Sequence, residues 1–75
     1  MSERHDLMLD KNLRALRKRK GLTQEALAKA AGIRPQTIYK YEKGIVKNIP
    51  YERIEALASA LETTPSRLLG WEDSK

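Results

Sequence analysis

Apolar residues recur three, four or seven positions apart along this chain, and glycine or proline interrupts the pattern at short intervals. This spacing predicts amphipathic α-helices, and no segment shows the sustained alternation of a β-strand. The chain has 75 residues, which is enough for one domain with a modest core. We therefore expect one all-α domain over residues 1–75, with frayed ends at about residues 1–6 and 72–75.

Local signals divide this domain into five short helices. The first is expected to stop at Gly21, because glycine favours the left-handed backbone that follows a helix. Thr23 is a good N-cap for the second helix, and Pro35 suits the first position of the third. Pro50 marks the start of the fourth helix, and Thr64 caps a very short fifth. The apolar faces that we expect to point inward are formed by Leu9, Leu13, Leu16, Leu27, Ala28, Ala31, Ile38, Tyr41, Ile54, Leu57, Ala58 and Leu61. The fifth helix carries the apolar residues Leu68 and Leu69.

The chain is basic, with a net charge of +5, and the basic residues are unevenly placed. Residues 1–49 hold 12 of the 15 lysines and arginines but only 5 of the 10 acidic residues. Such asymmetry indicates a polyanionic partner, although a solvated basic face would look the same. Most of the basic run from Arg14 to Lys20 is expected to be solvated, and only Arg19 and Lys20 remain candidates for phosphate contact.

The composition argues against several classes of function. There are no cysteines and one histidine, so we expect no metal site and no disulfide. No nucleophile–base pair or glycine-rich phosphate loop is present, so we expect neither an enzyme nor a cofactor or small-molecule ligand. No apolar run approaches a membrane span, and the N-terminus does not resemble a signal peptide. The expected compartment is the cytosol.

The second and third helices are separated only by the residues GIR, which predicts a helix-turn-helix. The outward face of the third helix then carries Gln36, Tyr39, Lys40 and Lys43, with Arg34 at its start. Arginine and lysine donate to guanine, glutamine pairs with adenine, and tyrosine can meet a thymine methyl group or a phosphate. Because an α-helix fits the major groove, this row predicts a helix that reads DNA.

Several segments together resemble one known family. They are Arg17 with Gly21, then LTQEALAKAAG, TIYKYEKG, IEALASAL and SRLLGW. Residues 13–70 are similar to the Cro/C1-type helix-turn-helix domain of phage repressors and bacterial Xre-like regulators, including those of mobile elements. The resemblance implies a five-helix, lambda-repressor-like bundle in the bacterial cytosol, associated with the nucleoid. It also implies a homodimer that binds an inverted-repeat operator in double-stranded DNA and regulates transcription, as a repressor.

The resemblance also assigns roles to individual residues. Base-reading positions fall on Arg34, Pro35, Gln36, Tyr39 and Lys40. Phosphate contacts are expected from Gln24, Thr37, Lys43, Lys47 and Asn48. A partly buried structural ion pair is implied between Arg17 and Glu42, and a dimer seam is expected from Leu68, Leu69 and Trp71.

The chain departs from the family pattern at the start of the third helix. A small capping residue is common there, whereas this chain has Arg34 followed by Pro35, and neither can supply a side-chain cap. The IVKN segment after the helix is also longer than in the compact lambdoid repressors.

Two alternative functions remain open at this point. The chain could be the DNA-binding half of a two-domain repressor, which would dimerise poorly by itself. It could instead be an adaptor or antitoxin whose helix-turn-helix binds a protein, but the polar row on the third helix argues against this. RNA binding is disfavoured, because the A-form major groove is too narrow for the helix.

Overall fold

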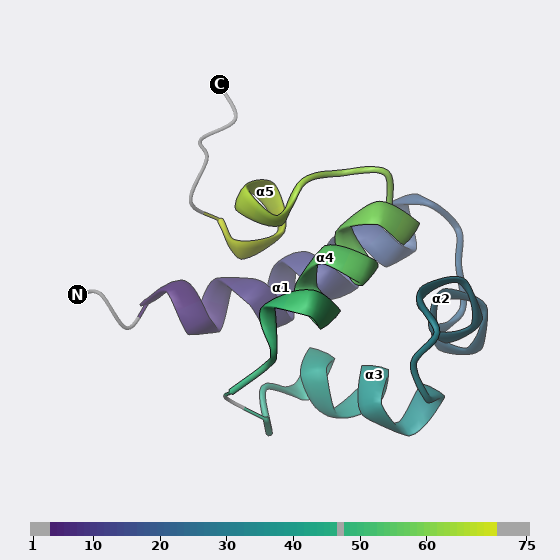
Figure 1. Cartoon of the computed structure of the whole chain (residues 1–75), viewed down its shortest axis with the longest axis horizontal. Coiled ribbons are helices and arrows are strands. Elements are labelled where there is room, and N and C mark those ends of the chain that lie inside the picture. Colours follow the sequence, from purple (N-terminus) through teal and green to yellow (C-terminus); the bar gives the residue numbers. More distant parts are fainter. Residues whose placement is uncertain (1–3, 47, 71–75) are drawn as a thin grey trace.

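The computed structural model describes residues 4–46 and 48–70, and in this part of the chain all regular structure is helical (Figure 1). The helices are α1 (Arg4–Arg19), α2 (Gln24–Ala31), α3 (Pro35–Lys43), α4 (Tyr51–Ala60) and α5 (Pro65–Leu69). The prediction of an all-α, five-helix domain is therefore confirmed.

The helix boundaries follow from the residues that occupy them. Thr23 and Thr64 cap α2 and α5, and each hydroxyl accepts a hydrogen bond from the backbone N–H three residues later, at 2.9 and 3.2 Å. Pro35 opens α3, where its fixed φ fits and its missing N–H costs nothing. Gly32 and Gly44 end α2 and α3 in the left-handed region, at φ 72° and 73°.

α1 begins at Arg4, so residues 4–6, which were expected to belong to a frayed end, are helical. A formed helix gains one hydrogen bond for each residue that it adds, so it can extend beyond the apolar face that stabilises it. The other residues predicted to fray, 1–3 and 72–75, lie outside the described part of the chain.

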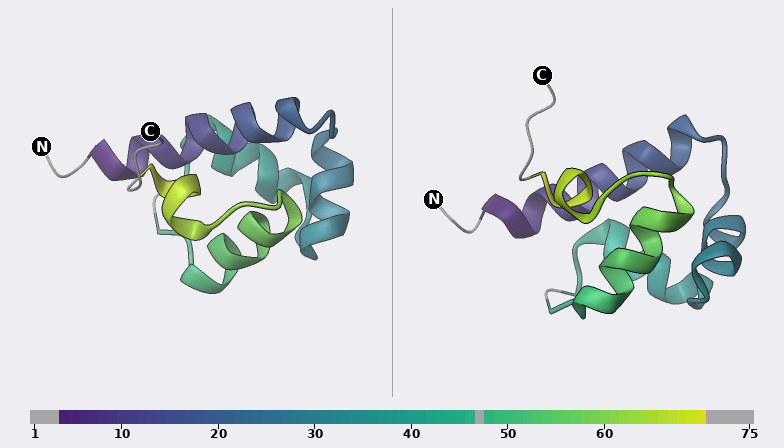
Figure 2. Two further views of the ribbon diagram at one scale, coloured as in Figure 1. Left: turned by 90° about the horizontal axis from the view of Figure 1, so that it is seen from above. Right: turned by 45° about the horizontal axis from the view of Figure 1, so that its top comes forward.

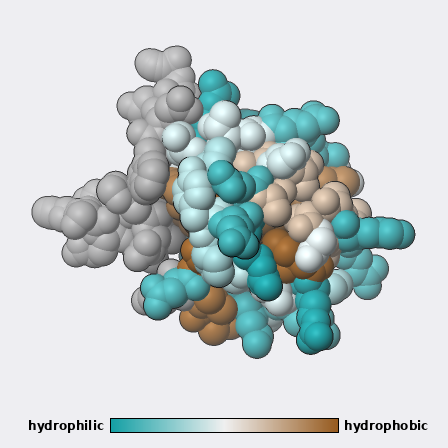
Figure 3. Space-filling view, in the orientation of Figure 1, coloured by the Kyte–Doolittle hydropathy of each residue, from teal (hydrophilic) through white to brown (hydrophobic). Residues whose placement is uncertain are grey.

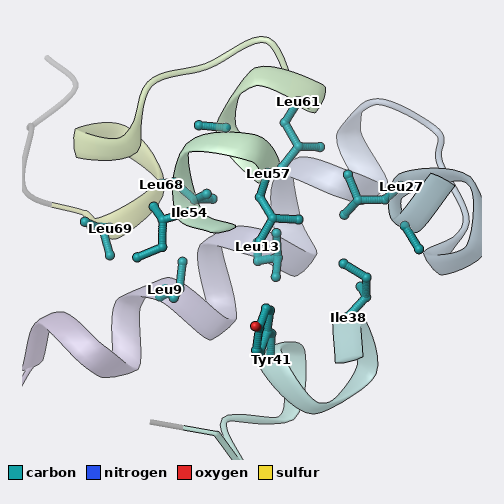
Figure 4. Packing of buried hydrophobic residues seen from close by; sticks show 12 residues of the cluster. Leu9, Leu13, Leu27, Ile38, Tyr41, Ile54, Leu57, Leu61, Leu68 and Leu69 are labelled. Atoms are coloured by element: carbon teal, nitrogen blue, oxygen red, sulfur yellow. The ribbon is translucent and has the colours of Figure 1, made fainter. Parts of the chain in front are cut away.

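The core lies between α1 and α4 and is closed from the sides by α2, α3 and α5. Leu13 of α1 meets Leu57 of α4 near its centre, with Ile38 and Tyr41 of α3 close by (Figure 4). Leu16 and Ala31 were expected to point inward, but they are only partly buried against this cluster. The fully buried large side chains are Leu13, Leu27, Ile38, Leu57, Leu61 and Leu68.

The position of α3 leaves one of its faces free. α1 packs against both α3 and α5, and α2 packs against α3 and α4. In Figures 1 and 2, α3 lies along the edge of the bundle opposite α5, with α1 and α4 between them. None of the helices in the described residues has the length and apolar character needed to cross a membrane.

Polar contacts reinforce this packing between distant parts of the chain. Asn12 of α1 donates from Nδ2 to the carbonyl of Leu68 at 3.0 Å, which fastens α5 to α1. Arg53 of α4 donates from Nη1 to the hydroxyl of Tyr41 at 3.1 Å, so the buried tyrosine has a partner for its polar end. These two bonds thus join α1 to α5 and α4 to α3.

Candidate nucleic-acid interface

The free face of α3 carries the polar row that the sequence predicted. Gln36, Tyr39, Lys40 and Lys43 are all exposed, and Tyr39 keeps 47% of its surface accessible although it is aromatic. Figure 3 shows hydrophilic side chains projecting along the edge of the molecule where α3 lies. Since residues three and four apart share one side of a helix, the row forms a continuous surface.

The start of α3 adds a further basic side chain to this surface. Arg34 occupies the N-cap with extended backbone, at φ −75° and ψ 146°, and its side chain makes no capping hydrogen bond. Pro35 follows as the first helical residue, and both residues are exposed. Thr37, two residues after Pro35, is partly buried. The side chain of Arg34 is therefore exposed at the turn between α2 and α3, beside the start of the row.

Arg17 and Glu42 form the ion pair that the resemblance implied. Arg17 donates from Nε to Oε2 of Glu42 at 2.6 Å and from Nη2 to Oε1 at 3.1 Å. A third bond runs from Nη1 of Arg17 to the carbonyl of Leu22 at 2.8 Å. The hydrogen bond to Glu42 raises the pKa of the Arg17 guanidinium, which therefore stays charged. One side chain thus ties α1 to the end of α3 and to the segment that leads into α2.

Gln24 belongs to the same network, which the sequence did not predict. Its Nε2 donates to Oε1 of Glu42 at 3.1 Å, so the side-chain nitrogen is held by the protein itself. Gln24 is also the first residue of α2, at the positive end of that helix. The bond to Glu42 fixes the direction of the amide and uses one of its two N–H donors. The second N–H and the backbone N–H groups at the start of α2 remain as donors for an anion.

A hollow of about 220 Å³ opens beside this network. Its walls come from α1, α2 and α3, and it shares two residues with the exposed row. Within that row, the ammonium of Lys43 lies 5.7 Å from the centre of the Tyr39 ring, a distance at which a cation and an aromatic face attract each other. The residues that line the hollow are Arg14, Arg17, Gln24, Tyr39, Glu42 and Lys43.

The remaining predicted site residues fall into three groups. Asn48 is exposed in the segment between α3 and α4, whereas Lys47 and Trp71 lie outside the described residues. Leu68 has no exposed surface and Leu69 keeps 8%, since both pack into the core of a single chain. Neither leucine therefore offers appreciable surface to a partner, because both belong to the core of the single chain.

No cluster of three or more metal-ligating side chains occurs among the residues that the structure describes. Charge is the main chemical property of the site: Arg34, Lys40 and Lys43 are exposed on or beside α3, while its only acid, Glu42, is turned inward to Arg17. Such a surface can bind an anion and donate hydrogen bonds to the edges of bases.

Comparison with known proteins identifies a family and a similar solved structure. A family model described as helix-turn-helix matches residues 13–68. The crystal structure of the restriction-modification controller protein C.AhdI from Aeromonas hydrophila superposes with a TM-score of 0.76. It is 37% identical, over 83% of this chain and 91% of that one. A search of curated proteins gave no match.

Proposed function

The chain belongs to the Cro/C1-type helix-turn-helix family and is a DNA-binding transcription regulator, and from this premise we propose that it is a repressor that binds an inverted-repeat operator as a homodimer. Its target would be the DNA of the bacterial nucleoid. The observation that carries the proposal is the exposed row on α3, which presents Gln36, Tyr39 and Lys40 from a helix whose other face is locked into the core.

In this proposal, α3 enters the major groove and its exposed side chains discriminate bases. Arg34, Gln36 and Lys40 supply donors, and Gln36 also supplies an acceptor, so it can pair with adenine through two hydrogen bonds. Pro35 and Tyr39 provide the apolar contacts. Each good bidentate contact contributes roughly 1–3 kcal/mol of discrimination between bases.

Contacts to the phosphates would set the position of α3 without reading sequence. We assign this role to residues around the two ends of the helix-turn-helix. They are Gln24, Thr37, Lys43, Lys47 and Asn48.

Two-fold symmetry would place the second α3 in the next major groove on the same side of the duplex, about 34–36 Å away. Because Leu68 and Leu69 expose little surface, Trp71 becomes the main candidate for the proposed seam. Loss of dimers on Trp71→Ala, with the fold intact, is the expected result.

The likeness to C.AhdI supports a more specific candidate, because it covers most of both chains. That protein is described as a restriction-modification controller. A regulator of restriction and modification genes is therefore a second candidate, and it predicts an operator next to such genes.

Selection of binding sites from random duplex DNA at fixed, near-physiological salt tests the proposal, together with the mass of the protein in solution. Recovery of an inverted repeat, with half-sites about one helical turn apart, is the expected result. Recovery of single half-sites by a monomer would instead favour the DNA-binding half of a two-domain repressor. Absence of any enrichment would overturn sequence-specific binding and favour a protein-interaction or antitoxin module.

A further inference from the structure

We propose that the hollow between α1, α2 and α3 holds one phosphate of the DNA backbone, and that Arg14 on α1 contacts this phosphate. The inference deepens the proposed function and depends on it. It adds a helix outside the helix-turn-helix to the DNA-binding surface, and it concerns a residue that the sequence analysis assigned to a solvated basic run.

The charges around the hollow are the first reason. Of its three cations, Arg17 is neutralised by Glu42, which is the only acid in the lining. Arg14 and Lys43 have no ion pair within the part of the chain that the structure describes. The lining therefore has two uncompensated positive charges, and a concave, protein-walled site strengthens their field.

The second reason is the way in which the walls are held. Glu42 accepts hydrogen bonds from both Arg17 and Gln24, so it has little remaining capacity to bind Arg14 or Lys43. Lys43 is placed over the ring of Tyr39, which keeps its ammonium beside the hollow. α2 begins at Gln24, so the positive end of its dipole adds to the attraction for an anion.

The third reason is the location and size of the hollow. Tyr39 and Lys43 belong both to its lining and to the exposed row of α3. If α3 occupies the major groove, the DNA strand at the edge of that groove would pass directly over the mouth of the hollow. The volume of about 220 Å³ equals that of several water molecules, at about 30 Å³ each, so a phosphate group can enter with part of its hydration.

The salt dependence of DNA binding tests this inference. Arg14→Gln removes the charge from an exposed position, so the fold should be retained, and a thermal unfolding curve checks this. We expect weaker binding to all duplexes alike, and a slope of log affinity against log salt that is reduced by about 0.9 for each bound copy of the chain. Arg14→Lys keeps the charge and should keep most of the slope.

Lys29→Gln is the matched control. It removes the same charge from an exposed position near the other end of α2, away from the hollow. An Arg14→Gln slope no different from that of Lys29→Gln would overturn the inference while the wild-type protein still bound its operator. If the wild-type protein bound no duplex at all, the proposed function would fail, and this inference with it.

Inorganic phosphate distinguishes the DNA backbone from a free anion. It is added at constant ionic strength without DNA, while the side-chain amide of Gln24 is followed by NMR. We expect no saturable shift, because a single small anion makes few of the contacts that a duplex makes. A saturable shift that Arg14→Gln abolishes, together with an unchanged salt slope for DNA, would assign the hollow to a free anion and overturn the DNA contact.

Discussion

Arg17 of α1 and Glu42 of α3 are joined by two hydrogen bonds, of 2.6 and 3.1 Å, and their side chains keep only 11% and 4% of their surfaces exposed. Two parallel N–H···O bonds between a guanidinium and a carboxylate fix orientation as well as distance. The pair therefore helps to fix the orientation of α3 relative to α1, and with it the direction in which the exposed row points.

The Arg17–Glu42 pair leads to a prediction about stability. Arg17→Met or Glu42→Leu alone should lower the free energy of unfolding by about 3 kcal/mol, because each leaves a charge poorly solvated and without its partner. The double variant should recover much of this loss, since no unpaired charge remains. Chemical denaturation of the four proteins measures the coupling. Single losses below about 1 kcal/mol, as for an exposed pair, would argue against this role.

Gln36 is predicted to read a base. Gln36→Ala should reduce the preference for one base pair in the operator by roughly 1–3 kcal/mol, because the exposed amide can no longer form its two hydrogen bonds. Competition binding with all four base pairs at each operator position measures the change. An equal loss of affinity for every sequence would show that Gln36 contacts the backbone and not a base.

Lys43 is predicted to contact a phosphate. Lys43→Ala should weaken binding to specific and random duplexes equally and lower the salt slope by about 0.9 per contact. Tyr39→Leu is a useful companion, because it removes the ring under the ammonium while preserving the charge. That variant should retain the slope. An unchanged slope for Lys43→Ala would exclude this lysine from the phosphate contacts.

Gly44 and Gly21 have nearly the same left-handed backbone, at φ 73° and 71°, but different surroundings. A Cβ at Gly44 would lie 2.6 Å from Oδ2 of Asp10, whereas one at Gly21 meets nothing within 4 Å. Gly21→Ala should therefore cost only the left-handed strain, about 1–2 kcal/mol, and Gly44→Ala should cost slightly more, because the carboxylate of Asp10 must rotate away. Adding Asp10→Ser should remove the difference between them. Equal unfolding free energies for the two single variants would contradict the close approach of Asp10.

Glu62 is predicted to give a small dependence of stability on pH. Its hydrogen bond from Lys20 holds the pKa of the carboxyl below its ordinary value of 4.5. The contribution is then present above pH 4.5 and is lost as the pH falls through the lower, folded-state pKa. Wild type should be more stable than Glu62→Gln at neutral pH, and the difference should vanish in acid. A difference that persists at low pH would mean that charge is not its source.

The sequence predicted the helices better than it predicted the site. Thr23, Thr64 and Pro35 set the starts of helices through interactions with the neighbouring backbone. Their effects can therefore be predicted from the sequence without knowing the fold. The pairing of Arg17 with Glu42 came from the resemblance, since the two residues are far apart in the chain. The bond between Gln24 and Glu42 depends on how α2 and α3 cross, and no local pattern encodes that angle.

Two further features depend on how the helices pack together. Leu68 and Leu69 could have faced either the core of their own chain or a second copy, because five residues are too few to define a face. Arg14 looked like any other member of a basic run, and only the closure of α2 and α3 around it produced a hollow.

The central claim, that α3 reads sequence, is tested most directly by one ratio. The affinity for the selected operator is divided by the affinity for a scrambled duplex of the same length and composition, both at the same near-physiological salt. Specific binding predicts a ratio of about 10³ or more. A ratio near one would mean that the row on α3 only attaches the protein to the DNA backbone, and it would contradict the account.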